Sequence, residues 1–277
     1  MDQWQLLLIA SPVFVINGIL ALFLAIVIFM HPSRDKTREW MLAATVIIPI
    51  GETLAGLVVY KLAYLRPYKI DLYIYQIDSL FGYPGFYLGQ FVNKYRMLKD
   101  TLCVVYGFLS SAILITFAWY LCKRSRKEAI AVAGSFTLNL FLAVPFYLCF
   151  PTCGPLFAFP TYPALPGPIV SHPIILNFPP NCIPSVHTST ALLIFWFLRQ
   201  WRWGKVFGSA FLLLTILATL GLGLHYFFDI LCAIPYAAFM IKCKDIFEDF
   251  SFKCSSRSAP IQNPLKMLIY RKNLNRE

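Results

Sequence analysis

The sequence predicts an all-α protein, built as a polytopic bundle of about seven membrane-spanning helices. Three observations support this prediction. The chain of 277 residues is 58% hydrophobic and only 13% charged, whereas about a quarter of the residues in soluble domains are charged. Its apolar residues gather in runs of membrane-spanning length. Its basic residues gather between those runs.

A run of about 17 to 25 apolar residues is long enough to cross a bilayer as a helix. The first run has no basic segment before it and no small-residue cleavage site, so we interpret it as a spanning helix and not a cleaved signal peptide. The shortest run lies at 187–201. All seven predicted spans are 6–30, 40–64, 101–122, 129–150, 187–201, 205–224 and 226–242.

The chain has a net charge of +11. The positions of its basic residues along the chain indicate how it is oriented in the membrane. If the runs alternate in direction, the basic clusters all fall on one side, as the positive-inside rule requires. We therefore expect an N-terminus outside and a basic C-terminal tail in the cytoplasm. No nucleic-acid partner is expected. The outer loops contain no glycosylation sequon, which fits a bacterial inner membrane.

The segment 65–100 is predicted to be an amphipathic helix at the outer interface, followed by a break at Gly82, Pro84 and Gly85. A poor eighth span is the alternative. Apolar residues recur at helical spacing and polar ones fall on the opposite face. The apolar set is Ile70, Tyr73, Ile74, Ile77 and Leu80, and the polar set is Asp71, Tyr75 and Asp78.

The segment 151–186 holds ten prolines and no charged residue. Proline prevents a regular helix, and lipid does not tolerate unsatisfied backbone groups. We expect this loop to fold over or into the outer mouth of the bundle. Cys153 and Cys182 share the loop, and a disulfide between them is one option in an oxidising compartment.

Two titratable side chains stand four residues apart in the apolar stretch GLGLHYFFDI, namely His225 and Asp229. On a helix this spacing puts them on one face, so Asp229 can accept a hydrogen bond from the imidazole and orient it. His187 begins another span on the same outer side and can serve as a general acid and base. The alternative interpretation is that these are polar groups at headgroup level.

A zinc site made of His187, His225 and Asp229 is also conceivable from the ligand types. No further ligand pair lies nearby in the sequence, so we expect no metal and no cofactor.

Two stretches, IPSVHTSTALL and LGLHYFFDILCAIP, together resemble a known family. They are similar to the "PSGH" and H-x-x-x-D motifs of the type 2 phosphatidic acid phosphatase superfamily. The variant looks closest to the branch of inositol phosphorylceramide synthases and related bacterial proteins. The resemblance covers roughly 100–242. It implies that His225 attacks a phosphate ester to form a phosphohistidine, that Asp229 orients it, and that His187 protonates the departing alcohol. The backbone around Ser185 would help to hold the phosphate.

The sequence departs from the family pattern where relatives carry arginine. The S-R pair before the nucleophile is replaced by Ala218 and Thr219, and the earlier K-x6-R-P motif is met only approximately, by Lys61 and Arg66. A phosphate needs cations near it. We therefore expect one of the outer-face cations to close the site, with Arg66 the first choice; the candidates are Arg66, Lys69, Lys94, Arg96 and Lys99.

The sequence thus predicts four regions: N-terminal transmembrane helices (1–64), an interfacial segment (65–100), a phosphatase- or phosphotransferase-like catalytic core (101–242) and a basic cytoplasmic tail (243–277). The predicted function is a membrane lipid phosphatase or phosphotransferase whose substrate is a lipid phosphate at the outer face. A catalytically silent lipid-binding member of the same fold is the alternative. A small transporter is disfavoured, because the spans are nearly free of polar residues.

Overall fold

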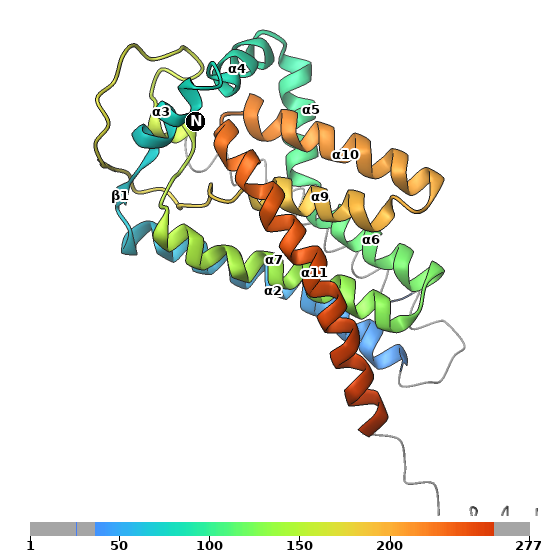
Figure 1. Cartoon of the computed structure of the whole chain (residues 1–277). Helices are drawn as coiled ribbons and strands as arrows, with labels where there is room; N and C mark the ends of the chain where they lie inside the picture. Colours follow the sequence, from blue (N-terminus) through green and yellow to red (C-terminus); the bar gives the residue numbers. More distant parts are fainter. Residues whose placement is uncertain (1–25, 27–36, 258–277) are drawn as a thin grey trace, which may run out of the picture.

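The computed structural model describes residues 37–257 and Ile26. The predicted span at 6–30 lies outside this part except for Ile26. The described residues form ten helices and one pair of short strands, so the protein is mostly helical as predicted. Long helices pack side by side as a bundle, and shorter elements gather at one end of it (Figure 1).

Two described helices are individually long and apolar enough to cross a membrane, α7 (Arg126–Cys149) and α10 (Arg202–Gly221). The helices α5 (Arg96–Gly107) and α6 (Leu109–Lys123) form a third candidate when counted as one span bent by 50°. These helices support membrane association. The count of seven spans stays a prediction.

Three further helices complete the bundle: α2 (Thr37–Leu65), α9 (Val186–Leu198) and α11 (Phe227–Arg257). Because α9 has 13 residues, it is too short to cross the hydrocarbon layer by itself. It lies among α7, α10 and α11.

A buried polar cluster ties the inner helices together. Asn139 on α7 donates to Thr190 Oγ1 at 2.9 Å and accepts from Ser189 Oγ at 2.9 Å, both on α9. Its carbonyl accepts a 2.6 Å hydrogen bond from Tyr236 of α11. An unpaired amide in such a place would be destabilising, so this cluster fixes how three helices align.

The predicted interfacial helix is divided in the structure. The segment contains strand β1 (Tyr68–Lys69), helix α3 (Asp71–Ser79), helix α4 (Pro84–Lys94) and the first residues of α5. The break falls where the sequence predicts it. Gly82 has φ of 75°, which glycine adopts without strain, and a proline begins α4.

The polar residues of α3 face into the protein. Asp71, Tyr75 and Asp78 are buried, whereas Leu80 is 81% exposed and Tyr73 is also exposed. The reason is that both carboxylates accept hydrogen bonds from backbone N–H groups inside the protein. The amphipathic pattern separates the two faces without specifying which one packs on the protein, and Ile74 of the apolar set is buried as well.

Asp78 binds the beginning of α11. Its two carboxylate oxygens accept hydrogen bonds from Phe227 N and Phe228 N, each at 2.9 Å. The first N–H groups of a helix have no partner within the helix, and negative charge there is stabilising. Asp78 thus supplies, from α3, the cap that α11 needs.

Asp71 binds the Pro-rich loop in the same way. It accepts hydrogen bonds from Cys153 N at 3.1 Å and Gly154 N at 2.9 Å, and from the hydroxyl of Tyr226 at 3.0 Å. One carboxylate therefore joins the interfacial segment, the loop and the chain just before α11.

The Pro-rich loop 151–186 is largely irregular, as predicted. It contains the short helix α8 (Pro155–Ala158) and the strand β2 (Ile174–Ile175). β2 pairs antiparallel with β1, with Tyr68 opposite Ile175 and Lys69 opposite Ile174. Cys153 and Cys182 are buried free thiols here, so the optional disulfide is not formed.

We predict that Asp78 makes stability depend on pH. Burial raises its pKa from 3.8 to about 6, although the hydrogen bonds from Phe227 and Phe228 oppose this shift. Between these two values the folded state binds more protons than the unfolded state, so stability falls as pH rises through this range. Asp78→Asn should reduce the fall by about 1 to 2 kcal/mol, since one pKa unit corresponds to about 1.4 kcal/mol.

Thermal unfolding in detergent, recorded from about pH 4 to about pH 7, measures this dependence. Asp100→Asn is the matched control, because Asp100 is exposed and pairs only with Arg96 across 3.8 Å at the surface. Equal pH slopes in wild type and Asp78→Asn would contradict the assignment.

Candidate functional site

His225 lies in the turn between α10 and α11, two residues before α11 begins. This place agrees with the predicted spans 205–224 and 226–242, which leave residue 225 between them, and the imidazole is carried by a turn. The carbonyl of Thr219 accepts hydrogen bonds from Leu224 N at 3.0 Å and His225 N at 3.1 Å. Gly223, at φ of 73°, makes the reversal. The backbone of His225 is thus fixed to the end of α10.

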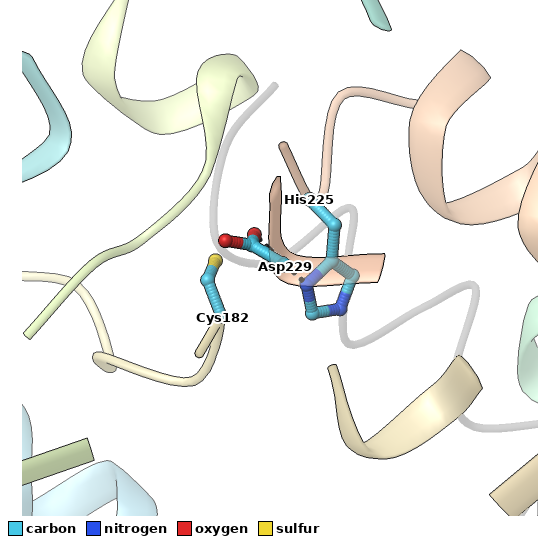
Figure 2. A group of neighbouring side chains, drawn as sticks. All are labelled: Cys182, His225 and Asp229. Atoms are coloured by element: carbon cyan, nitrogen blue, oxygen red, sulfur yellow. Dashed lines mark ion pairs between the residues drawn. The ribbon is translucent and has the colours of Figure 1, made fainter. Parts of the chain in front are cut away.

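Asp229 stands in the first turn of α11 beside the imidazole, as the four-residue spacing predicts (Figure 2). Its Oδ2 accepts a 2.8 Å hydrogen bond from Tyr226 N and lies 3.4 Å from Nδ1 of His225. Both side chains are buried, and neither Nδ1 nor the other oxygen, Oδ1, has a hydrogen-bond partner. The predicted neighbours are present, but the predicted hydrogen bond between them is not formed.

His187 occupies the first turn of α9. Its ring stacks on Tyr106 of α5, with 3.8 Å between ring centroids and 16° between the planes. Its centroid lies 6.1 Å from that of His225. Two imidazoles from separate segments therefore lie close together, with Asp229 beside His225 and Tyr106 stacked on His187.

Ser185 caps α9, and its side chain accepts a 3.3 Å hydrogen bond from Thr188 N. The Ser185 hydroxyl also donates to Thr188 Oγ1 at 3.1 Å, and Ser185 N donates to the carbonyl of Asp229 at 3.3 Å. These bonds position His187 relative to Asp229. The structure thus gives Ser185 a supporting role close to both.

The five candidate cations differ in burial. Arg66 directly follows α2 and is exposed. Lys94, at the end of α4, and Arg96, at the start of α5, are also exposed. Lys69 is fully buried, and its ammonium donates a hydrogen bond to the carbonyl of Arg66. Burial lowers the pKa of Lys69, while Cys153 and Asp71 nearby raise it. Lys69 therefore holds the backbone that carries Arg66.

Sequence reasoning missed four residues that build this site: Asp71, Tyr106, Cys182 and Tyr226. Cys182 and Tyr226 stand within or beside the two motifs, so their positions in the sequence give a usable signal. Asp71 was placed on the polar face of a helix without a partner, and Tyr106 lies in an apolar run that gives no signal. Cys182 Sγ donates to the carbonyl of Leu224 at 3.3 Å, which brings the Pro-rich loop against the turn of His225.

The Pro-rich loop packs tightly on that turn. Gly154, at φ of 94°, lies so close that a β-carbon there would overlap the Leu224 carbonyl. Leu156 N donates to Gly223 O at 2.8 Å. The hydroxyl of Tyr162 donates to Leu220 O at 3.1 Å, and its ring fills the space that side chains at Gly89 and Gly223 would occupy.

Comparison with known proteins gives a family for the chain. A family model described as the PAP2 superfamily matches residues 74–242. No curated protein and no solved structure matches the chain. The matched range contains His187, His225 and Asp229.

We predict that Gly154→Ala destabilises the protein by roughly 2 to 6 kcal/mol. A side chain at positive φ is strained by about 1 to 3 kcal/mol, and overpacking against the Leu224 carbonyl adds about as much. Gly56→Ala is the matched control, since Gly56 is exposed in α2 with nothing within 4 Å of its would-be β-carbon. That change should be neutral or slightly stabilising.

Chemical or thermal unfolding of the two variants in the same detergent gives the comparison. If Gly154→Ala melts with wild-type stability, the loop does not press on the His225 turn as described.

Proposed function

Because the chain belongs to the PAP2 superfamily, whose members are generally phosphatases or phosphotransferases, we propose that it is an integral-membrane lipid phosphatase or phosphotransferase. It acts through a phosphohistidine on a lipid phosphate ester at the outer membrane face. The supporting observation is the pair of imidazoles, His187 and His225, with ring centroids 6.1 Å apart and Asp229 behind His225.

In the first step Nε2 of His225 attacks phosphorus. A P–N bond forms, the ester P–O bond breaks, and the departing alcohol takes a proton from His187. Nδ1 is the nitrogen that faces Asp229. A small closure of the 3.4 Å gap lets the carboxylate accept a hydrogen bond from Nδ1–H and stabilise the positive charge that develops on the ring.

In the second step His187 takes a proton from water or from an acceptor hydroxyl. The resulting oxygen nucleophile attacks phosphorus, and the P–N bond breaks. Stacking on Tyr106 keeps the His187 ring in one orientation for both transfers. Water as acceptor gives a phosphatase, and a lipid hydroxyl gives a head-group transferase.

The scarcity of cations favours a diester substrate. A phosphomonoester carries about two negative charges near neutral pH, and a diester carries one. Thr219 stands where the resemblance predicts arginine, and it is buried with its hydroxyl donating to Ile216 O at 3.0 Å. The lack of an arginine at this position supports head-group transfer of the inositol phosphorylceramide synthase type. We propose that the chain belongs to that branch of the superfamily.

The membrane placement follows the same proposal. Seven spans put the motif residues and the segment 65–100 at the outer face and the basic tail in the cytoplasm, in a bacterial inner membrane. Two features agree with a site in the outer part of the bundle. The pair α5 and α6 is bent, and α9 is too short to cross the membrane.

We predict that His225→Ala lowers phosphate transfer by at least about 10³-fold, as loss of a nucleophile does in other covalent enzymes. His187→Asn should leave phosphoenzyme formation intact with an aryl phosphate, whose leaving group needs no proton, yet slow its breakdown. Labelled phosphate bound to the protein, measured by acid-labile incorporation, reports both effects.

His172→Ala is the matched control, since His172 lies exposed in the Pro-rich loop and bonds only to Val170 O at 3.0 Å. Equal turnover by wild type and His225→Ala would overturn the mechanism. No turnover or labelling by wild type, across monoester and diester lipids that it does bind, would indicate the silent lipid-binding alternative.

We further predict that Arg66 binds the phosphate, so Arg66→Gln should lower transfer by about 10²-fold, the usual effect of removing one charge-stabilising donor. Lys94→Gln, a change of another exposed cation that lies 5.8 Å from the Tyr95 ring, should have little effect. A silent Arg66→Gln would exclude Arg66 as the phosphate ligand. Full activity after neutralising all five outer cations would exclude the cation requirement.

A further inference from the structure

Three potential metal ligands converge at the turn of His225. One ligand atom each from Cys182, His225 and Asp229 lies within 4.8 Å of the others, and all three residues are buried (Figure 2). Cys182 comes from the Pro-rich loop, His225 from the turn and Asp229 from α11. Sequence reasoning considered His187 in place of Cys182, so the structure supplies a different set.

Two of the atoms in this group are unsatisfied. Nδ1 of His225 and Oδ1 of Asp229 have no hydrogen-bond partner, although their side chains are 1% and 0% exposed. A buried polar atom without a partner is destabilising by about 1 to 3 kcal/mol. A cation bound by Nδ1 and by both carboxylate oxygens would satisfy Nδ1 and Oδ1 at once.

The spacing suits a tetrahedral ion. Zinc bonds of about 2.0 to 2.3 Å to oxygen, nitrogen and sulfur put ligand atoms roughly 3.3 to 3.6 Å apart. Nδ1 of His225 already lies 3.4 Å from Oδ2 of Asp229. All three ligand atoms lie within 4.8 Å of one another. A pair at the full 4.8 Å would reach the zinc spacing after a shift of about 1 Å.

The backbone holds all three ligands in place. Cys182 N donates to Thr152 O at 3.3 Å, and His225 N donates to Thr219 O at 3.1 Å. Asp229 is fixed by the 2.8 Å bond from Tyr226 N. A preformed set of ligands binds an ion with less ordering of the chain.

The ligand types select the ion. Thiolate and imidazole favour zinc and similar soft or borderline cations, whereas magnesium and calcium prefer oxygen. On binding, the Cys182 thiol releases its proton to solvent, and the imidazole binds as the neutral ring. One thiolate and one carboxylate then neutralise a divalent cation, which satisfies the requirement that buried charges be paired.

We propose that Cys182, His225 and Asp229 form an inhibitory site for a zinc-class divalent cation. The inhibition rests on the proposed function, because the ion takes Asp229 and one nitrogen of His225 away from phosphate transfer. Binding itself does not rest on it. With Nδ1 on the ion, the neutral imidazole carries its proton on Nε2, so Nε2 has no free electron pair with which to attack phosphorus while the ion is bound.

Cobalt(II) titration of the full-length protein in detergent tests the binding, because a Co²⁺–thiolate bond gives a near-ultraviolet absorption band. Wild type should show the band, and Zn²⁺ should displace it. Cys182→Ser should abolish the band, and Asp229→Asn should weaken Co²⁺ binding at least about tenfold. Cys149→Ser is the matched control, since Cys149 is an exposed free thiol, and it should keep the band.

Absence of the band in wild type, or its persistence in folded Cys182→Ser, would overturn the site whatever the enzymatic activity. Turnover is then measured with added Zn²⁺, each variant relative to its own metal-free rate. The inhibitory Zn²⁺ concentration should rise at least about tenfold in Cys182→Ser. Binding without any loss of turnover would overturn the inhibitory role. A protein that binds the metal but has no turnover would instead contradict the proposed function.

Discussion

Asp71 and Asp78, two buried carboxylates on α3, bind backbone N–H groups that would otherwise have no partner. Asp78 caps α11, and Asp71 joins the Pro-rich loop to Tyr226. His225 immediately precedes these attachment points, Tyr226 for Asp71 and Phe227 and Phe228 for Asp78, so its position depends on both. Charge-assisted bonds to backbone donors are stronger than neutral ones, which explains how the short helix α3 can hold a turn that has little regular structure of its own.

Sequence reasoning predicted the helical class, the break near Gly82, the irregular Pro-rich loop and the closeness of His225 and Asp229. These features follow from local rules: residue composition, the conformational limits of proline and glycine, and helical spacing. The partners of Asp71 and Asp78 could not be predicted in this way. An amphipathic pattern separates polar from apolar positions, but the backbone groups that these two carboxylates bind come from residues 153–154 and 226–228, far away in the sequence.

The roles of Ser185 and Lys69 show the same limit at the candidate site. Motif resemblance assigns Ser185 to the phosphate, while the structure also makes it the cap of α9 and a link to Asp229. Lys69 is one of the five cations considered for the phosphate site, and only the structure, where it is buried, distinguishes it as the one that holds the backbone of Arg66. Such distinctions depend on tertiary contacts. The match over 74–242 supports the family without resolving them.

The packing around Tyr162 has an evolutionary consequence. Its ring lies against Gly89 of α4 and Gly223 of the turn, where a β-carbon at either glycine would overlap it. A larger residue at one glycine is tolerated only if the aromatic ring is replaced by something smaller. These three positions should therefore change together among relatives of this chain, and a coordinated substitution would leave a coevolutionary signal linking the Pro-rich loop to the turn that carries His225.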